Sequence, residues 1–327
     1  MQQQIQRSRG PRSPLACQYL VLTAPRATCG PLSVLWHLIP FLVSVLSTAC
    51  GSSPRTFADV EAGQVWMVPD EVTALRSLLA SAGLAPRQLG VEGELASTTG
   101  NWLELDEEGR IWSLGLAEVP ELDSLEPLAA LERLSRVRIR GASLDSLEGL
   151  GSADQLTFLS IEDSGLRQLD GLDGCRALRV LDLRGNALTT TEGLAELPAL
   201  HSLDLAGNRL ETLTGLAWRE RLESLYLQDN ALVDVAGLAH LPRLERLHLS
   251  RNALSSLDGL RDLPALRELL VDGNRLTDAS AVDQLPSLEI VGLGGNRLET
   301  FPALVDRLPQ HLWQDNPGTL RYRSSDP

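Results

Sequence analysis

Side chains suited to catalysis are few in this sequence of 327 residues. It contains four cysteines, five histidines and no lysine. The missing lysine leaves no amine for Schiff-base or phosphate-loop chemistry. No phosphate loop, nucleophile elbow, HExxH motif or paired-histidine metal spacing occurs, and the histidines after residue 50 are scattered at positions 201, 240, 248 and 311. The sequence therefore predicts a protein that is not an enzyme and uses no cofactor and no metal ion.

Charge is distributed unevenly along the chain. The first 50 residues contain four arginines and no acid, whereas the rest contains 25 arginines against 43 acids, a net charge of −18. A surface this acidic repels phosphate backbones. We therefore expect no nucleic-acid partner.

An apolar run over residues 31–50 follows the basic residues and ends in Leu46-Ser47-Thr48-Ala49-Cys50. Basic residues, an apolar stretch and then small residues are the pattern of an export signal. The ending resembles the lipobox of bacterial lipoproteins, which implies that Cys50 is lipidated and becomes the mature N-terminus. It also implies a lipid-anchored protein of the cell envelope, at the outer membrane in a diderm bacterium because Gly51 follows. The alternative is an ordinary signal peptide cut after Ala49.

Asparagines recur every 22 residues inside the frame LxxLxLxxNxL, at Asn186, Asn208, Asn230, Asn252, Asn274 and Asn296. In the clearest copy Leu222, Leu225, Leu227, Asn230 and Leu232 fill the frame. This pattern identifies the chain as a member of the leucine-rich repeat family, with a resemblance that covers roughly residues 111–316.

The spacing has a physical reason. Leu225 and Leu227 alternate along a short strand, so both side chains point to the same side, while Tyr226 between them reaches solvent. No single coil can bury this apolar face alone, and stacked coils bury it together. Asn230 turns inward, where its amide can bond backbone groups of its own and adjacent coils.

The 22-residue length and the Gly-Leu-x-x-Leu-Pro return arm resemble those of internalin-like and phosphatase-regulatory leucine-rich repeats. The resemblance implies an α/β solenoid: a curved horseshoe with a parallel concave β-sheet and short 3₁₀ turns on the convex side. A helix with Asp70 as its N-cap and Gly83 as its stop, followed by a hairpin over 102–112, is expected to cap the N-terminal end. The predicted segments are a leader (1–50), a linker (51–63), an N-terminal cap (64–110), about nine repeats (111–310) and a C-terminal cap (311–327).

Candidate binding residues are those that depart from the repeat on the exposed strand positions. At the central exposed position, two coils hold Asp182 and Asp204, and aspartate is the residue usually found there in this repeat. The next three coils hold Tyr226, His248 and Leu270 instead. Arg246 and Glu268 stand beside them. Aromatic and arginine side chains are enriched in partner sites. We expect these five residues, Tyr226, His248, Leu270, Arg246 and Glu268, to bind the partner.

A second candidate is the strand that exposes Arg136, Arg138 and Arg140, with Phe158 beside it. It could anchor an acidic ligand. The alternative is that Glu162 and Asp163 on the next coil simply neutralise the arginines.

These features favour an exported, lipid-anchored protein that binds a protein or an envelope component through its concave face. The alternative is an intracellular regulatory subunit of a phosphatase or another signalling enzyme, located in the cytoplasm. The leader and Cys50 favour the first.

Overall fold

The computed structural model describes residues 56–63, 65–91, 100–194, 197–213, 216, 220–299 and 302–303. The chain divides into two units, Met1–Cys50 and Gly51–Pro327, and every described residue belongs to the second. The predicted leader, Cys50 and the predicted C-terminal cap lie outside the described residues. Within the described part, no helix is long and apolar enough to cross a membrane.

The second unit contains short helices near its N-terminus and a long series of strands. In chain order the elements are α2 (Phe57–Glu61), α3 (Pro69–Ser81), η1 (Pro86–Gln88), β1 (Gly90–Val91), β2 (Trp102–Leu105), β3 (Ile111–Ala117), η3 (Glu126–Ala130), β4 (Arg136–Arg140), β5 (Phe158–Glu162), β6 (Val180–Asp182), β7 (Ser202–Asp204), β8 (Ser224–Tyr226), β9 (Arg246–His248), β10 (Glu268–Leu270), η5 (Ser280–Gln284) and β11 (Ile290–Gly292). The η elements are 3₁₀ helices.

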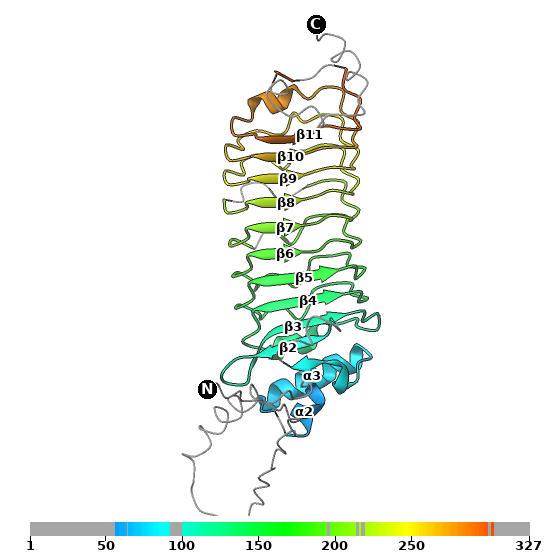
Figure 1. The fold of residues 1–327 in the computed structure, drawn as a ribbon, viewed down its shortest axis with the longest axis vertical. Helices are drawn as coiled ribbons and strands as arrows, with labels where there is room; N and C mark the ends of the chain where they lie inside the picture. Colours follow the sequence, from blue (N-terminus) through cyan, green and yellow to red (C-terminus); the bar gives the residue numbers. More distant parts are fainter. Residues whose placement is uncertain are drawn as a thin grey trace, which may run out of the picture. The chain divides into compact units, whose positions relative to one another are not determined.

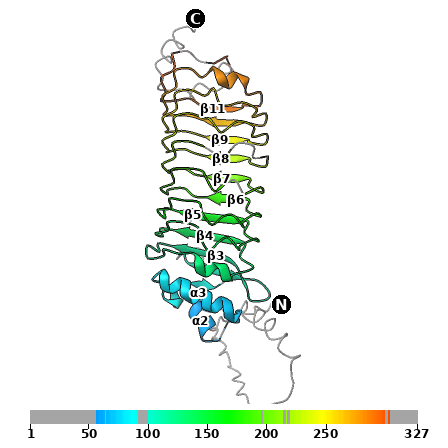
Figure 2. The same cartoon turned by 180° about the vertical axis from the view of Figure 1, so that it is seen from behind.

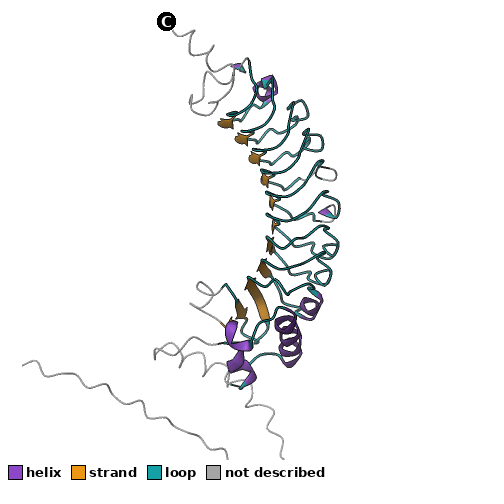
Figure 3. Ribbon diagram, turned by 90° about the vertical axis from the view of Figure 1, so that its right-hand side faces the viewer, coloured by secondary structure: helices purple, strands orange, loops and turns teal. Residues whose placement is uncertain are grey.

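The strands form one sheet in which they follow one another in chain order (Figure 1). β2 and β3 form the predicted antiparallel hairpin, and each strand from β4 to β11 pairs in parallel with the strand before it. The strands line the concave side of the solenoid and the return arms form its outer side (Figure 3). Seen from behind, the return arms stack in the same order as the strands (Figure 2). The predicted leucine-rich-repeat horseshoe is confirmed.

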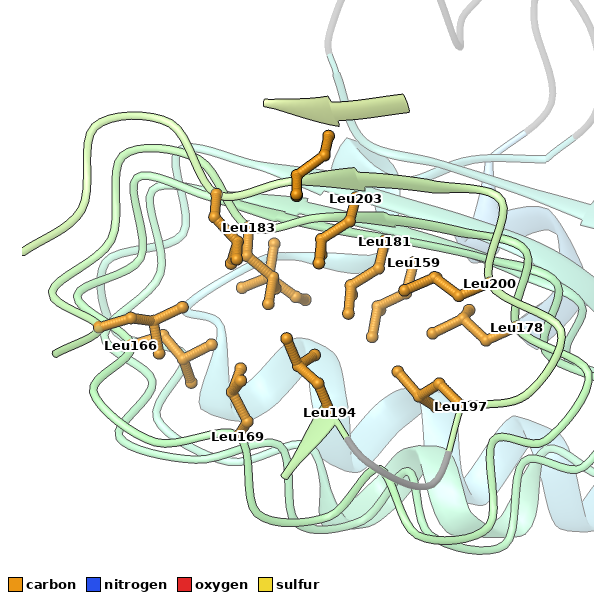
Figure 4. Packing of buried hydrophobic residues seen from close by; sticks show 14 of the residues in the cluster. Leu159, Leu166, Leu169, Leu178, Leu181, Leu183, Leu194, Leu197, Leu200 and Leu203 are labelled. Atoms are coloured by element: carbon orange, nitrogen blue, oxygen red, sulfur yellow. The ribbon is translucent and has the colours of Figure 1, made fainter. Parts of the chain in front are cut away.

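Leucines fill the space between the sheet and the return arms. Leu159, Leu181 and Leu203 come from successive strands and lie side by side beneath the sheet, opposite Leu194 and Leu197 of a return arm (Figure 4). The three strand leucines are fully buried. Each contributes roughly 1.5–3 kcal/mol relative to an exposed side chain, and it can do so only when neighbouring coils are in place.

The repeating asparagines connect the coils through their side-chain amides. Asn208 donates from Nδ2 to the carbonyl oxygens of Leu205 in its own coil, at 3.0 Å, and of Leu183 in the coil before, also at 3.0 Å. Its Oδ1 accepts the backbone N–H of Leu188 at 3.0 Å. The same pattern recurs at Asn230, Asn252, Asn274 and Asn296. These amides satisfy backbone groups that two strands and their turns leave open.

The convex side uses two kinds of turn. Gly171 has a φ of +103°, and a Cβ atom there would lie 2.3 Å from the carbonyl oxygen of Leu147 in the coil before. Only glycine fits such a turn. Because every residue of a 3₁₀ helix has a negative φ, a 3₁₀ helix cannot include the glycine of this turn. In η3 and η5 the equivalent positions are Pro127 and Ala281, and the arms there do form 3₁₀ helices. The expected 3₁₀ turns are therefore present on these arms, whereas the arm with Gly171 turns at its glycine.

The N-terminal cap differs from the sequence prediction in two details. Helix α3 begins at Pro69 with Val68 as its N-cap, so Asp70 is in the first turn and is not the cap. Proline favours the first helical position because its missing N–H has no partner there. Residues 56–61 of the predicted linker belong to the cap: Phe57 is fully buried and donates its N–H to Leu89, at 2.9 Å.

Glu71 joins helix α3 to the first coil. Its carboxylate is buried, and Oε2 accepts the backbone N–H of Ile111 at 2.7 Å. Oε1 lies 3.7 Å from Nη1 of Arg110. Burial raises the pKa of Glu71 above its ordinary value, although the hydrogen bond from Ile111 and the charge of Arg110 act in the opposite direction. Sequence analysis did not single out this residue, because its burial depends on contact with Ile111, 40 residues further along the chain.

We predict that Asn208→Ala destabilises the fold by about 1–3 kcal/mol, because the substitution leaves buried carbonyl and N–H groups without partners. The exposed neighbour Arg209 is the matched control, and Arg209→Ala should change the free energy of unfolding by less than about 0.5 kcal/mol. Urea denaturation of both variants measures the difference. Equal midpoints for the two variants would contradict the structural role of the asparagines.

We predict that Glu71→Ala destabilises by about 1–3 kcal/mol at neutral pH, because the buried N–H of Ile111 loses its acceptor. Glu71→Gln keeps an acceptor and should be much milder. The raised pKa means that the folded state binds a proton more tightly than the unfolded chain. The wild type should therefore gain stability relative to Glu71→Gln as the pH falls from 7 to about 4.5, the ordinary pKa of the group. A constant difference between the two proteins over this range, measured by denaturation, would refute the raised pKa.

Candidate binding face

The concave sheet brings the central exposed positions of all coils into one column. The strand register aligns, in order, Gly115, Arg138, Ser160, Asp182, Asp204, Tyr226, His248, Leu270 and Gly292. Flanking positions form parallel columns, so Arg246 pairs with Glu268 and Glu268 with Ile290. Adjacent side chains in a column lie about 4.8 Å apart, the spacing between strands.

The candidate residues on β8, β9 and β10 touch one another. The rings of Tyr226 and His248 meet edge to face, with centroids 4.8 Å apart and an interplanar angle of 88°. His248 Nε2 lies 3.1 Å from Glu268 Oε1, and Arg246 Nε lies 3.7 Å from Glu268 Oε2. Glu268 therefore holds both basic side chains, and His248 fixes the Tyr226 ring. These contacts are made within the chain itself, without a partner.

Apolar surface continues beyond this cluster toward the last described strand. Leu270 is half-buried, and its Cδ2 atom lies close to Gly292 of β11. Ile290, at the start of β11, is 43% exposed. Sequence analysis missed Ile290 because isoleucine is also an ordinary residue in strands. Its position beside Glu268 makes the apolar area of the candidate face larger than the sequence indicated.

The arginines of β4 are mostly paired within the protein. Arg138 Nη2 lies 2.9 Å from Glu162 Oε1, and Arg140 Nη2 lies 2.7 Å from Glu118 Oε1. The Arg136 guanidinium lies over the Phe158 ring, 5.1 Å from its centroid. Glu162 thus neutralises Arg138, in agreement with the alternative that acids on the next coil pair with these arginines. The partner of Arg140 is Glu118 rather than Asp163.

Glu162 lies at the centre of a buried polar group. Burial alone would raise the pKa of Glu162, but hydrogen bonds from Ser160 and Arg184 and the charge of Arg138 outweigh it and lower the pKa. The carboxylate therefore stays ionised and holds two arginines, Arg138 and Arg184. This arrangement reduces the free positive charge that β4 offers to an acidic ligand.

The coils that carry Tyr226 and His248 also depart from the repeat at the edge of the sheet. Asp229 and Arg251 have φ values of +59° and +55° at the position where the two preceding coils have glycine. A left-handed conformation is costly for such residues. Their side chains form a two-contact ion pair across the coils, which lowers the pKa of Asp229. Sequence analysis missed this pair, although the interruption of the Gly-Asn dipeptide was a visible signal.

The described residues offer no arrangement suited to metal binding or thiol chemistry. No group of three or more histidine, cysteine, aspartate or glutamate side chains among them could hold a metal ion. Cys175 is buried, and burial raises the pKa of its thiol to about 11. This part of the chain presents two groups of contacting aromatic and charged side chains on its concave sheet, one around Tyr226 and His248 and one around Phe158 and Glu162.

Comparisons with known families agree with this geometry. The profile described as "Leucine rich repeat" matches residues 220–276, and the profile "Leucine Rich repeats (2 copies)" matches residues 176–218. This is a leucine-rich repeat protein. No curated protein sequence matches this leucine-rich repeat protein significantly.

Solved leucine-rich repeat structures share the fold at low sequence identity. The functional domain of InlJ from Listeria monocytogenes is 18% identical with a TM-score of 0.52, and the match covers 65% of this chain and 55% of that one. A leucine-rich repeat protein of Leptospira interrogans is 20% identical with a TM-score of 0.51, covering 74% and 80%. The plant peptide hormone receptor RGFR1, solved in complex with RGF2, is 21% identical with a TM-score of 0.51, covering 66% and 39%. This chain thus spans well under half of RGFR1.

Proposed function

We propose that this leucine-rich repeat protein binds a protein or a cell-envelope component through its concave face, with Tyr226, His248 and Leu270 at the centre of the site. The observation that carries the proposal is the ordered cluster on three successive strands, where side chains depart from the repeat. Folding does not require these side chains, because the leucines and asparagines supply the core and the coil contacts. Arg246 and Glu268 supply polar contacts that orient the partner.

The character of the cluster supports recognition of a macromolecule. Tyrosine and arginine are enriched at the energetic centres of interfaces, and the side chains here are already held in place. Leu270 and Ile290, which lie beside the charged cluster and are partly exposed, would add apolar area to an interface at this place. The receptor RGFR1, which shares the fold, is itself solved with RGF2 bound.

We further propose that the protein is exported and anchored to the cell envelope by a lipid on Cys50. The support is the apolar run that ends in Ser47-Thr48-Ala49-Cys50 after a segment with arginines and no acids. No such support exists for the alternative of an intracellular phosphatase subunit, which rests on the resemblance of the repeats alone.

We predict that Tyr226→Ala with His248→Ala abolishes capture of the partner by the full-length protein. Losing a central aromatic anchor typically costs at least about 2 kcal/mol of binding, roughly thirtyfold in affinity. Pull-down from the native cell envelope compares the double variant with wild type, and its unfolding transition should be nearly unchanged. Asp182→Asn is the control, since Asp182 is the residue usual for the central exposed position of the repeat and lies outside the proposed site. If the double variant captures the same partner at wild-type strength, the site lies elsewhere, and the strand of Arg136, Arg138 and Arg140 with Phe158 becomes the next candidate.

We predict that Cys50→Ala moves the protein out of the membrane fraction and removes incorporation of labelled fatty acid. One acyl chain binds membranes only marginally, so stable anchoring implies several chains on this cysteine. Cys175→Ala is a matched control because that thiol is buried. Fatty-acid labelling that persists in the Cys50→Ala protein would refute the anchor without affecting the proposed binding face.

A further inference from the structure

Asp182 and Asp204 occupy equivalent positions on adjacent strands, yet their surroundings differ in charge. Arg184 lies two residues after Asp182, and its Nη2 is 2.8 Å from Asp182 Oδ2. The equivalent residue after Asp204 is Ala206, which brings no charge. Among the described residues, no arginine or histidine lies within ion-pair distance of Asp204. Asp204 therefore has no ion-pair partner of its own among the described residues, unlike Asp182.

This carboxylate is held at the concave surface and is half-buried. Its Oδ1 accepts the backbone N–H of Ala206 at 2.9 Å, which fixes the orientation of the group. Burial raises the pKa of Asp204, and the hydrogen bond from Ala206 and the charges of Arg184 and His248 offset this effect only in part. A cation placed beside it would compensate the remaining cost of burial.

An aromatic ring stands directly beside Asp204 on the next strand. The register pairs Asp204 with Tyr226, and the edge-to-face contact with His248 holds the Tyr226 ring. Aromatic rings attract ammonium and guanidinium groups, and a nearby carboxylate adds a charge-assisted hydrogen bond. The pair combines the two contacts that recognise a lysine or arginine side chain.

The charge around this pair favours a basic partner. The outward-facing positions from β7 to β11, counted as the residue before each strand, the outward strand residues and the residue two places after the central position, include two arginines, Arg246 and Arg267. Those two are paired with Glu268 and Glu289. Four further carboxylates on the same surface have no ion pair among the described residues: Asp204, Glu223, Glu245 and Asp272. The corresponding positions from β4 to β6 carry five arginines and two acids, so the acidic character is confined to the half that contains the cluster.

We propose that the partner presents a basic segment to strands β7–β11 and that an arginine or lysine side chain of this segment binds between Asp204 and Tyr226. The proposal rests on the proposed role of the concave face and specifies the chemistry that this face recognises. Asp204 supplies the charge, Tyr226 the aromatic surface, and the unpaired carboxylates around them attract the segment at longer range.

The test uses the full-length chain labelled with 3-fluorotyrosine. The chain has three tyrosines, and Tyr226→Phe identifies the fluorine resonance of Tyr226. The probe is the peptide acetyl-Leu-Arg-Leu-amide, and its control replaces arginine with citrulline, which has the same shape and no charge. The arginine peptide should shift the Tyr226 resonance saturably, and the citrulline peptide should bind about tenfold more weakly, since a tenfold change corresponds to about 1.4 kcal/mol.

Variants locate the contact. Asp204→Asn keeps an acceptor for the Ala206 N–H, so the fold is preserved, and it should weaken binding of the arginine peptide about tenfold. Asp182→Asn, at the equivalent but paired position, should leave the affinity within about twofold. Binding should also weaken as salt is added.

Three results would overturn the proposal: equal affinity for the arginine and citrulline peptides, unchanged affinity in Asp204→Asn, or no shift of the Tyr226 resonance with either peptide. None of these decides whether the concave face binds a partner, which the capture experiment with the double variant tests separately. If the double variant loses capture of the partner but the arginine peptide does not bind at Asp204, the concave face binds its partner without an arginine or lysine beside Asp204.

Discussion

No single coil of this protein can bury its own leucines. Each coil presents an apolar face that is covered only when the next coil stacks against it, and the asparagine amides span the same junctions. Stacking requires equivalent residues to meet in every coil, and the strand register does bring Leu181, Leu203 and Leu225 into line at intervals of 22 residues. The parallel sheet, the concave face and the column of exposed positions all follow from this single constraint.

The same constraint leaves some positions free. Side chains that point away from the core are not specified by stacking, so their identities can serve another purpose. On β8 and β9 the departures occur together: Tyr226 and His248 replace the usual aspartate, and Asp229 and Arg251 take a turn position that holds glycine in the two coils before and the two coils after. Asp204, on the neighbouring coil, has no arginine in the position from which Arg184 pairs with Asp182. These changes cluster on adjacent coils, which is the pattern expected when one surface is adapted to one partner.

Sequence periodicity was sufficient to predict the repeat fold, the hairpin and the inward position of Asn208, because each depends on local spacing that stacking then enforces. It could not predict which carboxylate would pair with Arg140, since Glu118 is reached through contacts between coils. The N-cap of α3 was misjudged because Asp70 is a favourable cap by residue type, whereas Pro69 determines where the helix begins. Phe57 was assigned to a linker because its burial depends on residues over 30 positions away.

Residue-resolved hydrogen exchange under native conditions tests the stacking constraint most directly. The backbone N–H groups of Leu188, Leu210, Leu232, Leu254 and Leu276 each donate to the asparagine of the following coil. If the coils support one another, the free energy of opening should approach that of global unfolding at Leu210 and Leu232 and fall toward both ends. Opening at Leu210 or Leu232 that costs no more than at the terminal coils, while the rest of the solenoid stays closed, would show that the coils fold independently and would contradict the account.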